Sequence, residues 1–118
     1  MADTPRPGGK LGRSNDAGVL ILTSLASGSK HGYALARDIE QFSGVTLGPG
    51  TLYGAITRLE ERGLIEPADH DERRRPYRIT AAGRAELTTA VRELGAIATE
   101  GARRLGLPLL VPRLGWAL

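Results

Sequence analysis

The sequence has 118 residues, a formal net charge of +3 and no cysteine. This length suits one compact domain with an added helix and is too short for two ordinary domains. Without cysteine there are no disulfides, thiolate metal ligands or cysteine nucleophiles, and the composition does not indicate a secreted, oxidised protein. We therefore expect a cytoplasmic protein.

Residues 1–15 combine prolines, glycines and charges, which is typical of a disordered arm, and they lack the apolar run of a signal peptide. The longest apolar stretch elsewhere, residues 18–22, is far shorter than the ~20 residues that a membrane-spanning helix needs. We expect no association with a membrane. The excess of positive charge lies in the arm and in the run 73–75, whereas residues 17–66 are slightly acidic. A basic balance is compatible with a polyanionic partner but does not identify one.

Three helices are predicted in the first half of the chain. They span residues 17–26, 32–42 and 51–62. Asn15 and Asp16 can cap the first helix, which is apolar on nearly every side and is therefore expected to be buried, although its β-branched residues also suit a strand. The second helix is amphipathic. The third opens at Gly48-Pro49-Gly50 and closes at Gly63, which is predicted to be a left-handed cap.

A hairpin and a fourth helix follow. Residues 64–66 and 77–79 alternate in polarity and predict two strands around a polar tip at 68–75. Thr80 is a candidate cap for a helix from 81 to about 105, whose apolar positions recur near a 3.5-residue period and so favour pairing with another helix. The residues expected at this pairing surface are Leu87, Val91, Leu94, Ala98 and Leu105, with Ile97 as the alternative to Ala98 in the repeat.

Three helices, a hairpin and a further helix form the order of a winged helix-turn-helix domain. In such domains the third helix enters the major groove of DNA and the hairpin reaches neighbouring phosphates. The predicted fold class is therefore mainly α with a small β-hairpin. We expect a winged-helix domain over 16–80 and a dimerisation helix over 81–106, followed by an apolar tail, 107–118, that is broken by two prolines and has no assigned role.

Four short blocks, in this order, give a more specific signal. They are His31-Gly32-Tyr33, then Gly48-Pro49-Gly50-Thr51-Leu52-Tyr53, then Arg58-Leu59-Glu60 with Gly63-Leu64-Ile65, and finally Tyr77-Arg78-Ile79-Thr80 with Gly83. Together they closely resemble the PadR-like regulators over roughly residues 18–94. The resemblance implies a DNA-binding homodimer, usually a repressor, whose C-terminal helix pairs with its twin. It leaves open a small-molecule effector that acts through the dimer interior or the wing.

Two positions depart from the family pattern. Gly48 stands where a serine is expected, and Gly54 where a proline is expected. A glycine inside a helix costs about 1 kcal/mol relative to alanine, so the start of this recognition helix is expected to be looser. The chain resembles the short members of the family, which have a single dimerisation helix.

The third helix offers a surface suited to DNA on the side opposite its apolar stripe. Its glycines let the backbone approach a duplex closely, Tyr53 and Thr57 can donate hydrogen bonds, and Arg58 can reach a guanine edge. The basic run at the predicted wing suits phosphates. The expected DNA-binding residues are Lys30, Tyr33, Gly50, Thr51, Tyr53, Thr57, Arg58, Arg73, Arg74 and Arg75.

Structural explanations compete with several of these assignments. The outward side of the third helix and the arginine run also fit ordinary solvated surface. At the start of the second helix, His31 can simply cap the helix, and Tyr33 can pack on the first helix with its hydroxyl in water. For this segment, phosphate binding by Lys30 and the Tyr33 hydroxyl and these structural roles of His31 and Tyr33 are equally compatible with the sequence.

No catalytic, metal or cofactor site is predicted. His31 and His70 are the only histidines, too few for a structural zinc site or a Ser/His/Asp arrangement. The acidic turn around His70 fits solvated surface, and the spacing of the glycines near residue 50 is not that of a nucleotide-binding loop. One alternative stays open, namely a winged helix that serves as a protein–protein assembly module. In that case the third helix is buried against a partner, and Glu60, Glu61 and Glu66 suit the contact.

Overall fold

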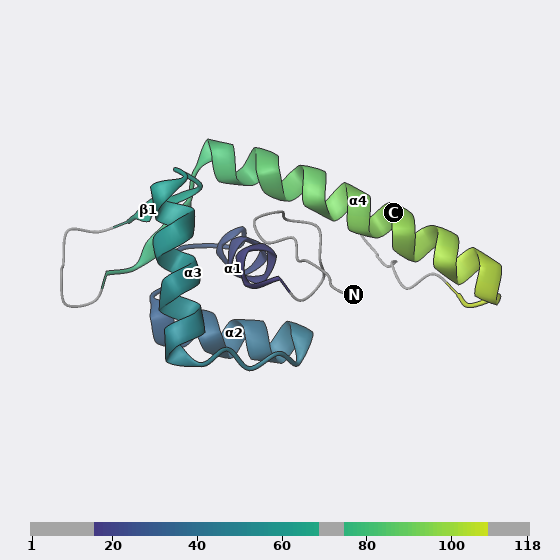
Figure 1. Cartoon of the computed structure of the whole chain (residues 1–118), viewed down its shortest axis with the longest axis horizontal. Helices are drawn as coiled ribbons and strands as arrows, with labels where there is room; N and C mark the ends of the chain where they lie inside the picture. Colours follow the sequence, from purple (N-terminus) through teal and green to yellow (C-terminus); the bar gives the residue numbers. More distant parts are fainter. Residues whose placement is uncertain (1–15, 69–74, 109–118) are drawn as a thin grey trace, which may run out of the picture.

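The computed structural model describes residues 16–68 and 75–108. The predicted arm at 1–15, Asn15 within it, Arg73, Arg74 and residues 109–118 of the tail lie outside the described residues. The elements are α1 (Ala17–Leu25), α2 (Gly32–Ser43), α3 (Pro49–Glu61), β1 (Ile65–Pro67), β2 (Tyr77–Ile79) and α4 (Ala81–Leu105). The fold is mainly helical with an antiparallel two-stranded hairpin and a long C-terminal helix, as the sequence predicts (Figure 1).

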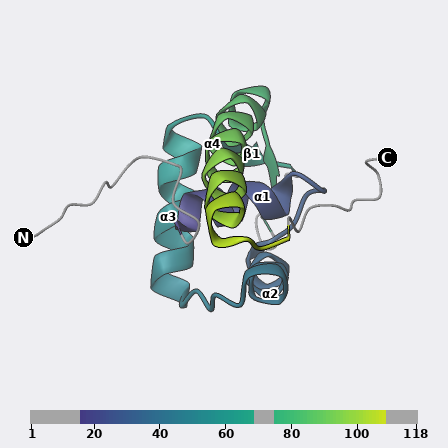
Figure 2. The same ribbon diagram turned by 90° about the vertical axis from the view of Figure 1, so that its right-hand side faces the viewer.

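Helix α1 is the centre of the domain. It contacts α2, α3, α4 and β2, and the two views at right angles show α3 across one side of it, α4 above and α2 below (Figures 1 and 2). A helix surrounded in this way must be apolar on all sides. Its buried residues are Val19, Leu20, Ile21, Leu22, Ser24 and Leu25. The helical interpretation of this segment is confirmed, and the strand alternative is wrong.

Local signals in the sequence account for most of the boundaries. The Asp16 carboxylate accepts a hydrogen bond from the Gly18 backbone N–H at 2.7 Å, and the Thr80 hydroxyl accepts one from the Gly83 N–H at 3.0 Å, so both predicted N-caps are present. Gly63 has a φ of 76° and ends the turn after α3 as predicted. Helix α3 begins two residues earlier than predicted, because Pro49 occupies its first turn, where a missing N–H does no harm.

A third backbone segment, which no sequence pattern predicted, joins the hairpin. The Lys30 N–H donates to the Tyr77 carbonyl at 3.1 Å, and the Tyr77 N–H donates to the Lys30 carbonyl at 2.9 Å. On its other edge, Tyr77 lies opposite Pro67 of β1. The hairpin is therefore fixed to the turn between α1 and α2 at the point where it leaves the domain.

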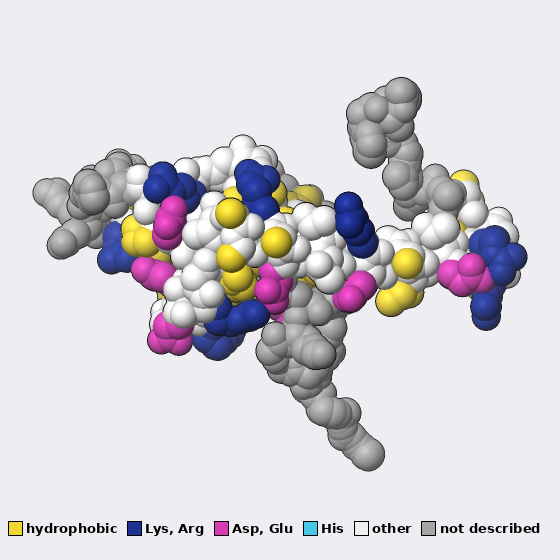
Figure 3. Space-filling view, turned by 90° about the horizontal axis from the view of Figure 1, so that it is seen from above, with side chains coloured by type: hydrophobic (Ala, Val, Ile, Leu, Met, Phe, Trp, Pro, Cys, Tyr) yellow, Lys and Arg dark blue, Asp and Glu magenta, His cyan; other side chains and the backbone are white. Residues whose placement is uncertain are grey.

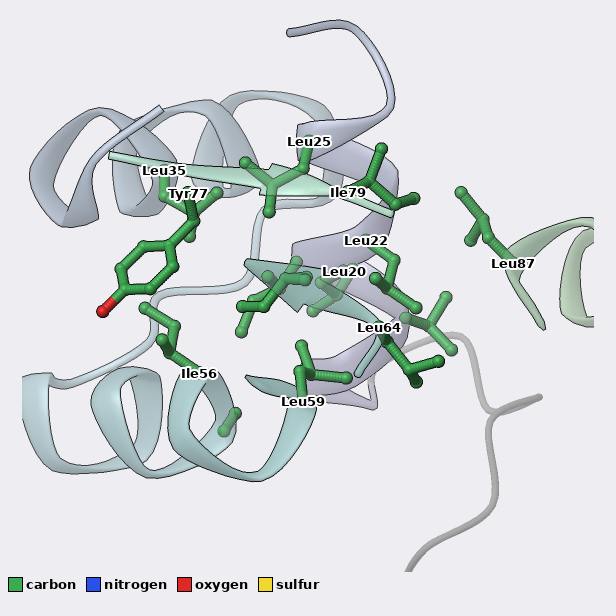
Figure 4. Packing of buried hydrophobic residues seen from close by; sticks show 14 of the residues in the cluster. Leu20, Leu22, Leu25, Leu35, Ile56, Leu59, Leu64, Tyr77, Ile79 and Leu87 are labelled. Atoms are coloured by element: carbon green, nitrogen blue, oxygen red, sulfur yellow. The ribbon is translucent and has the colours of Figure 1, made fainter. Parts of the chain in front are cut away.

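The core gathers side chains from every element (Figure 4). Leu35, Ile56 and Tyr77 meet on one side of α1, and Leu64, Ile79 and Leu87 on the other. The first turn of α4 lies so close to the hairpin that a Cβ at Gly83 would overlap the Leu64 carbonyl oxygen. Only glycine permits this approach.

Helix α4 has two halves with different surroundings. At about 1.5 Å per residue its 25 residues span roughly 37 Å. Its first half packs on the domain through Gly83, Leu87 and Ala90, whereas its second half extends beyond the domain (Figure 1). The view from above shows hydrophobic side chains along this second half and a charged cluster at its far end (Figure 3).

The expected row of helix-pairing residues needs one correction. Leu87 is only 8% exposed and belongs to the core of its own chain, so its assignment to a dimer surface is wrong. Leu94 is half-buried against that core. Val91, Ala98 and Leu105 are exposed, and so is Ile97, at 70%. Within the described residues, no helix is long and apolar enough to cross a membrane.

Candidate nucleic-acid interface

The predicted division of α3 into two sides is confirmed. Leu52, Ala55, Ile56 and Leu59 are buried in the core. The opposite side is open to solvent, and its exposed residues are Gly50, Thr51, Tyr53, Thr57, Arg58 and Glu61. Within the described chain, none of the ion pairs involves Arg58, whose guanidinium lies beside Gly54. This side of α3 thus carries glycines, hydroxyl groups and an accessible arginine, and no bulky aliphatic side chain projects from it.

Tyr53 connects this surface to the start of α2. A Cβ at Gly32 would overlap the Tyr53 hydroxyl, so the phenol lies directly over the first residue of α2. The ring is still half exposed. The Thr57 hydroxyl donates to the Tyr53 carbonyl at 3.0 Å, and its oxygen remains able to accept a hydrogen bond. These contacts place two hydroxyl groups on one exposed strip of α3.

Tyr33 lies in the first turn of α2 and is 72% exposed, so the alternative in which it packs on the first helix is wrong. The Arg37 guanidinium donates to its hydroxyl at 3.4 Å and lies 5.8 Å from its ring centroid. This hydrogen bond raises the pKa of Arg37 above its ordinary value. The side chain of His31 makes no capping hydrogen bond, although the residue occupies the N-cap position. Sequence reasoning missed Arg37, which the i, i+4 spacing from Tyr33 could have indicated.

Lys30 has a structural role in place of the expected phosphate contact. Its ammonium donates to the Ser24 carbonyl at 2.6 Å, the Ser27 hydroxyl at 3.1 Å and the Gly28 carbonyl at 3.4 Å, and lies 4.0 Å from the Asp38 carboxylate. An ammonium has three donors, and here all three bind groups at the end of α1. Lys30 therefore caps the C-terminus of α1, and its assignment to DNA is wrong.

The arginines of the hairpin that the structure describes both lie next to glutamates. Arg75 Nη2 is 3.5 Å from Glu60 Oε2 on α3, and its guanidinium is 5.6 Å from the Tyr77 ring centroid. Arg78 pairs with Glu66 across the hairpin at 2.8 Å. Arg75 is thus brought beside α3, as a wing contact requires. Among the described residues, no cluster of three or more metal-ligating side chains is present.

Known proteins resemble this chain in both sequence and fold. Residues 21–89 match the transcriptional regulator PadR-like family. The chain is 42% identical over 83 residues to the transcriptional regulator Rv3488 of Mycobacterium tuberculosis, covering 68% of this chain and 77% of the relative. It is 53% identical over 72 residues to an uncharacterized 37.1 kDa protein in transposon TN4556 of Streptomyces fradiae, which is 61% of this chain but only 21% of that protein.

Solved structures agree with this assignment. A PadR family transcription regulator from hypervirulent Clostridium difficile superposes with a TM-score of 0.66 at 26% identity, covering 75% of this chain and 96% of that one. A transcriptional regulator from Clostridium thermocellum gives 0.62 at 27% identity, with coverages of 73% and 89%. The matched family comprises regulators, not enzymes. The chain belongs to the PadR-like family of transcriptional regulators.

Proposed function

We propose that the protein is a DNA-binding transcription regulator that acts as a homodimeric repressor on an inverted-repeat operator. The observation that carries this proposal is the exposed side of α3, which has glycines, hydroxyl groups and Arg58 opposite a fully buried apolar stripe. An amphipathic helix at the surface of a winged-helix domain with this composition suits the major groove. A regulator acts where the chromosome is, so the proposal places the protein in the cytoplasm.

Each group on this surface has a distinct role in the proposal. Gly50 and Gly54 let the α3 backbone approach the duplex, and Arg58 reads a guanine edge through its two parallel donors. Thr51 and Tyr53 donate to phosphates or bases, and the Thr57 hydroxyl oxygen accepts from a base amino group. Tyr33 and Arg37 contact the backbone from the start of α2, and Arg73, Arg74 and Arg75 contact the adjacent phosphates from the wing.

The second half of α4 supplies the dimer contact in this proposal. Its exposed apolar side chains extend beyond the domain that they belong to, where a second copy can cover them. The proposed contact comprises Val91, Leu94, Ile97, Ala98 and Leu105. Pairing two such helices gives a two-fold dimer, and the two copies of α3 must lie about 34 Å apart, one turn of DNA, to enter successive major grooves. An inverted-repeat operator follows from that symmetry.

The protein–protein assembly alternative receives little support from the charges that suggested it. Glu60 and Glu66 already pair with Arg75 and Arg78 of the same chain. Of the three glutamates, only Glu61 is fully free of such an ion pair within the described residues. We therefore retain DNA binding as the function.

A titration of the full chain against a fluorescent duplex of random sequence, followed by anisotropy at two salt concentrations, tests the proposal. A dimer that contacts about six phosphates should lose roughly a thousandfold in affinity between about 50 and 200 mM salt, because each phosphate contact releases counterions. An assembly module would bind weakly at both concentrations. Absence of measurable binding at the lower salt concentration would contradict the proposed function.

A further inference from the structure

The ion pair between Glu60 and Arg75 connects the proposed reading helix to the base of the wing. Glu60 lies near the end of α3, one residue after the core residue Leu59, and Arg75 lies two residues before Tyr77 of β2. The carboxylate and the guanidinium are 3.5 Å apart, and both side chains are partly exposed, at 35% and 47%. A group in solution can therefore reach the guanidinium.

We propose that Glu60 lowers the DNA affinity of this protein by holding Arg75, and that a DNA phosphate replaces Glu60 when the wing docks. This inference rests on the proposed DNA-binding function and goes beyond it, because it assigns a role to an acidic residue next to the DNA surface. The partner that displaces Glu60 is defined by its chemistry, as a phosphodiester oxygen of a duplex.

Tyr77 allows Arg75 to change partner without moving away. Tyr77 is only 8% exposed, and the backbone of this residue is paired on both edges, with Lys30 and with β1. The Arg75 guanidinium lies over this fixed ring at 5.6 Å from the centroid, an arrangement in which a cation is attracted to the face of the ring. The ring can therefore hold the guanidinium beside α3 while either a carboxylate or a phosphate binds its donors.

The relative strengths of the two partners favour exchange. A partly exposed ion pair at this distance is weak, because water and salt screen both charges. A duplex presents one negative charge per about 1.7 Å of its axis and gains entropy when a cation displaces its counterions. The cost of releasing Glu60 then reduces binding to every sequence alike. Only complexes in which the other contacts form well keep a high affinity.

A double-mutant cycle on the whole 118-residue chain tests this inference. The proteins are the wild type, Glu60→Gln, Arg75→Ala and the double variant, and each is titrated with random-sequence duplex over a salt series. Gln preserves the shape of the side chain and removes its charge. We expect Glu60→Gln to bind roughly threefold to tenfold more tightly at low salt with a nearly unchanged salt slope, because Arg75 contacts a phosphate in the complexes of both proteins, whereas Arg75→Ala should lower the slope by about one. In the Arg75→Ala background, Glu60→Gln should have little effect.

Glu61→Gln is the matched control. Glu61 is adjacent on α3 and exposed, and among the described ion pairs none joins it to Arg75. Its removal can raise affinity through general charge, but that effect should be the same with and without Arg75. Unchanged binding by Glu60→Gln, or a gain that persists fully without Arg75, would overturn the inference while leaving DNA binding intact. If no protein of the set binds DNA, the proposed function fails, and the inference fails with it.

Discussion

The Tyr53 phenol lies directly over Gly32, so close that a Cβ at residue 32 would overlap the phenol oxygen. Gly32 is buried at the start of α2, and Tyr53 projects half exposed from α3. This contact sets the spacing of the two helices at the surface proposed to meet DNA. It also explains physically why the His31-Gly32-Tyr33 block needs glycine at its centre.

Gly32→Ala should displace the phenol. Alanine gains up to ~1 kcal/mol in helix propensity, which offsets part of the clash, so the free energy of unfolding should change by less than about 1 kcal/mol. DNA affinity should fall roughly fivefold, because Tyr53 no longer lies on the outer side of α3. Anisotropy titration measures this loss. In a Tyr53→Ala background, Gly32→Ala should have no further effect on DNA affinity. A further fivefold loss of affinity in the double variant would contradict this explanation.

Gly83→Ala tests the close contact between α4 and the hairpin. The added Cβ meets a backbone oxygen, which cannot move aside, so we expect a loss of about 3 kcal/mol in the free energy of unfolding by urea denaturation. Gly95→Ala makes the same chemical change in the same helix where a Cβ meets nothing, and it should be neutral or stabilising by up to ~1 kcal/mol. Equal effects of the two substitutions would contradict the described packing.

The sequence predicted those parts of the fold that depend on local chemistry. Asp16 and Thr80 cap helices because their side chains bind N–H groups two or three residues away. The uniformly apolar composition of α1 likewise predicts that this helix is buried at the centre of the domain. The pairing of Lys30 with Tyr77 was not predictable, because it joins backbone groups distant in the chain and needs no particular side chain.

Leu87 illustrates a second limit of sequence reasoning. A 3.5-residue apolar period shows which side of a helix is buried, but the pattern is the same whether the helix packs on its own domain or on a partner. Here the first turns of α4 face the core, and only the later turns lie beyond it. On the surface proposed to meet DNA, the exposure of Tyr53, Thr57 and Arg58 was predicted from the helical wheel. The tertiary contacts of Arg75 and Lys30 were not predicted.

Gly48 leaves the start of α3 without a side-chain cap. Gly48→Ser places a hydroxyl where it can accept from an N–H of the first turn, and a Cβ there meets nothing. We expect a gain of about 0.5 kcal/mol in the free energy of unfolding. Gly48→Ala adds the methyl carbon without the cap and serves as the control. If alanine stabilises the protein as much as serine does, the cap is not the cause.

Ile97→Glu tests the proposed dimer more cleanly than a change at Leu94, which also contacts the core of its own chain. A buried charge at an apolar helix pair is costly, so sedimentation should show a monomer at concentrations where the wild type is a dimer. Ala96→Glu introduces the same charge on the side of α4 that carries Arg92 and Glu100, and it should leave the dimer intact. A dimer that persists in Ile97→Glu would remove this part of α4 from the interface.

Selection of bound fragments from a random DNA pool tests most directly whether two α3 helices read DNA together. The account predicts enrichment of an inverted repeat whose half-sites are centred about 34 Å apart, or roughly one helical turn. It also predicts that Arg58→Ala relaxes the preference at one base pair in each half-site. Recovery of unrelated sequences by the wild type, or of a single asymmetric site, would contradict this account.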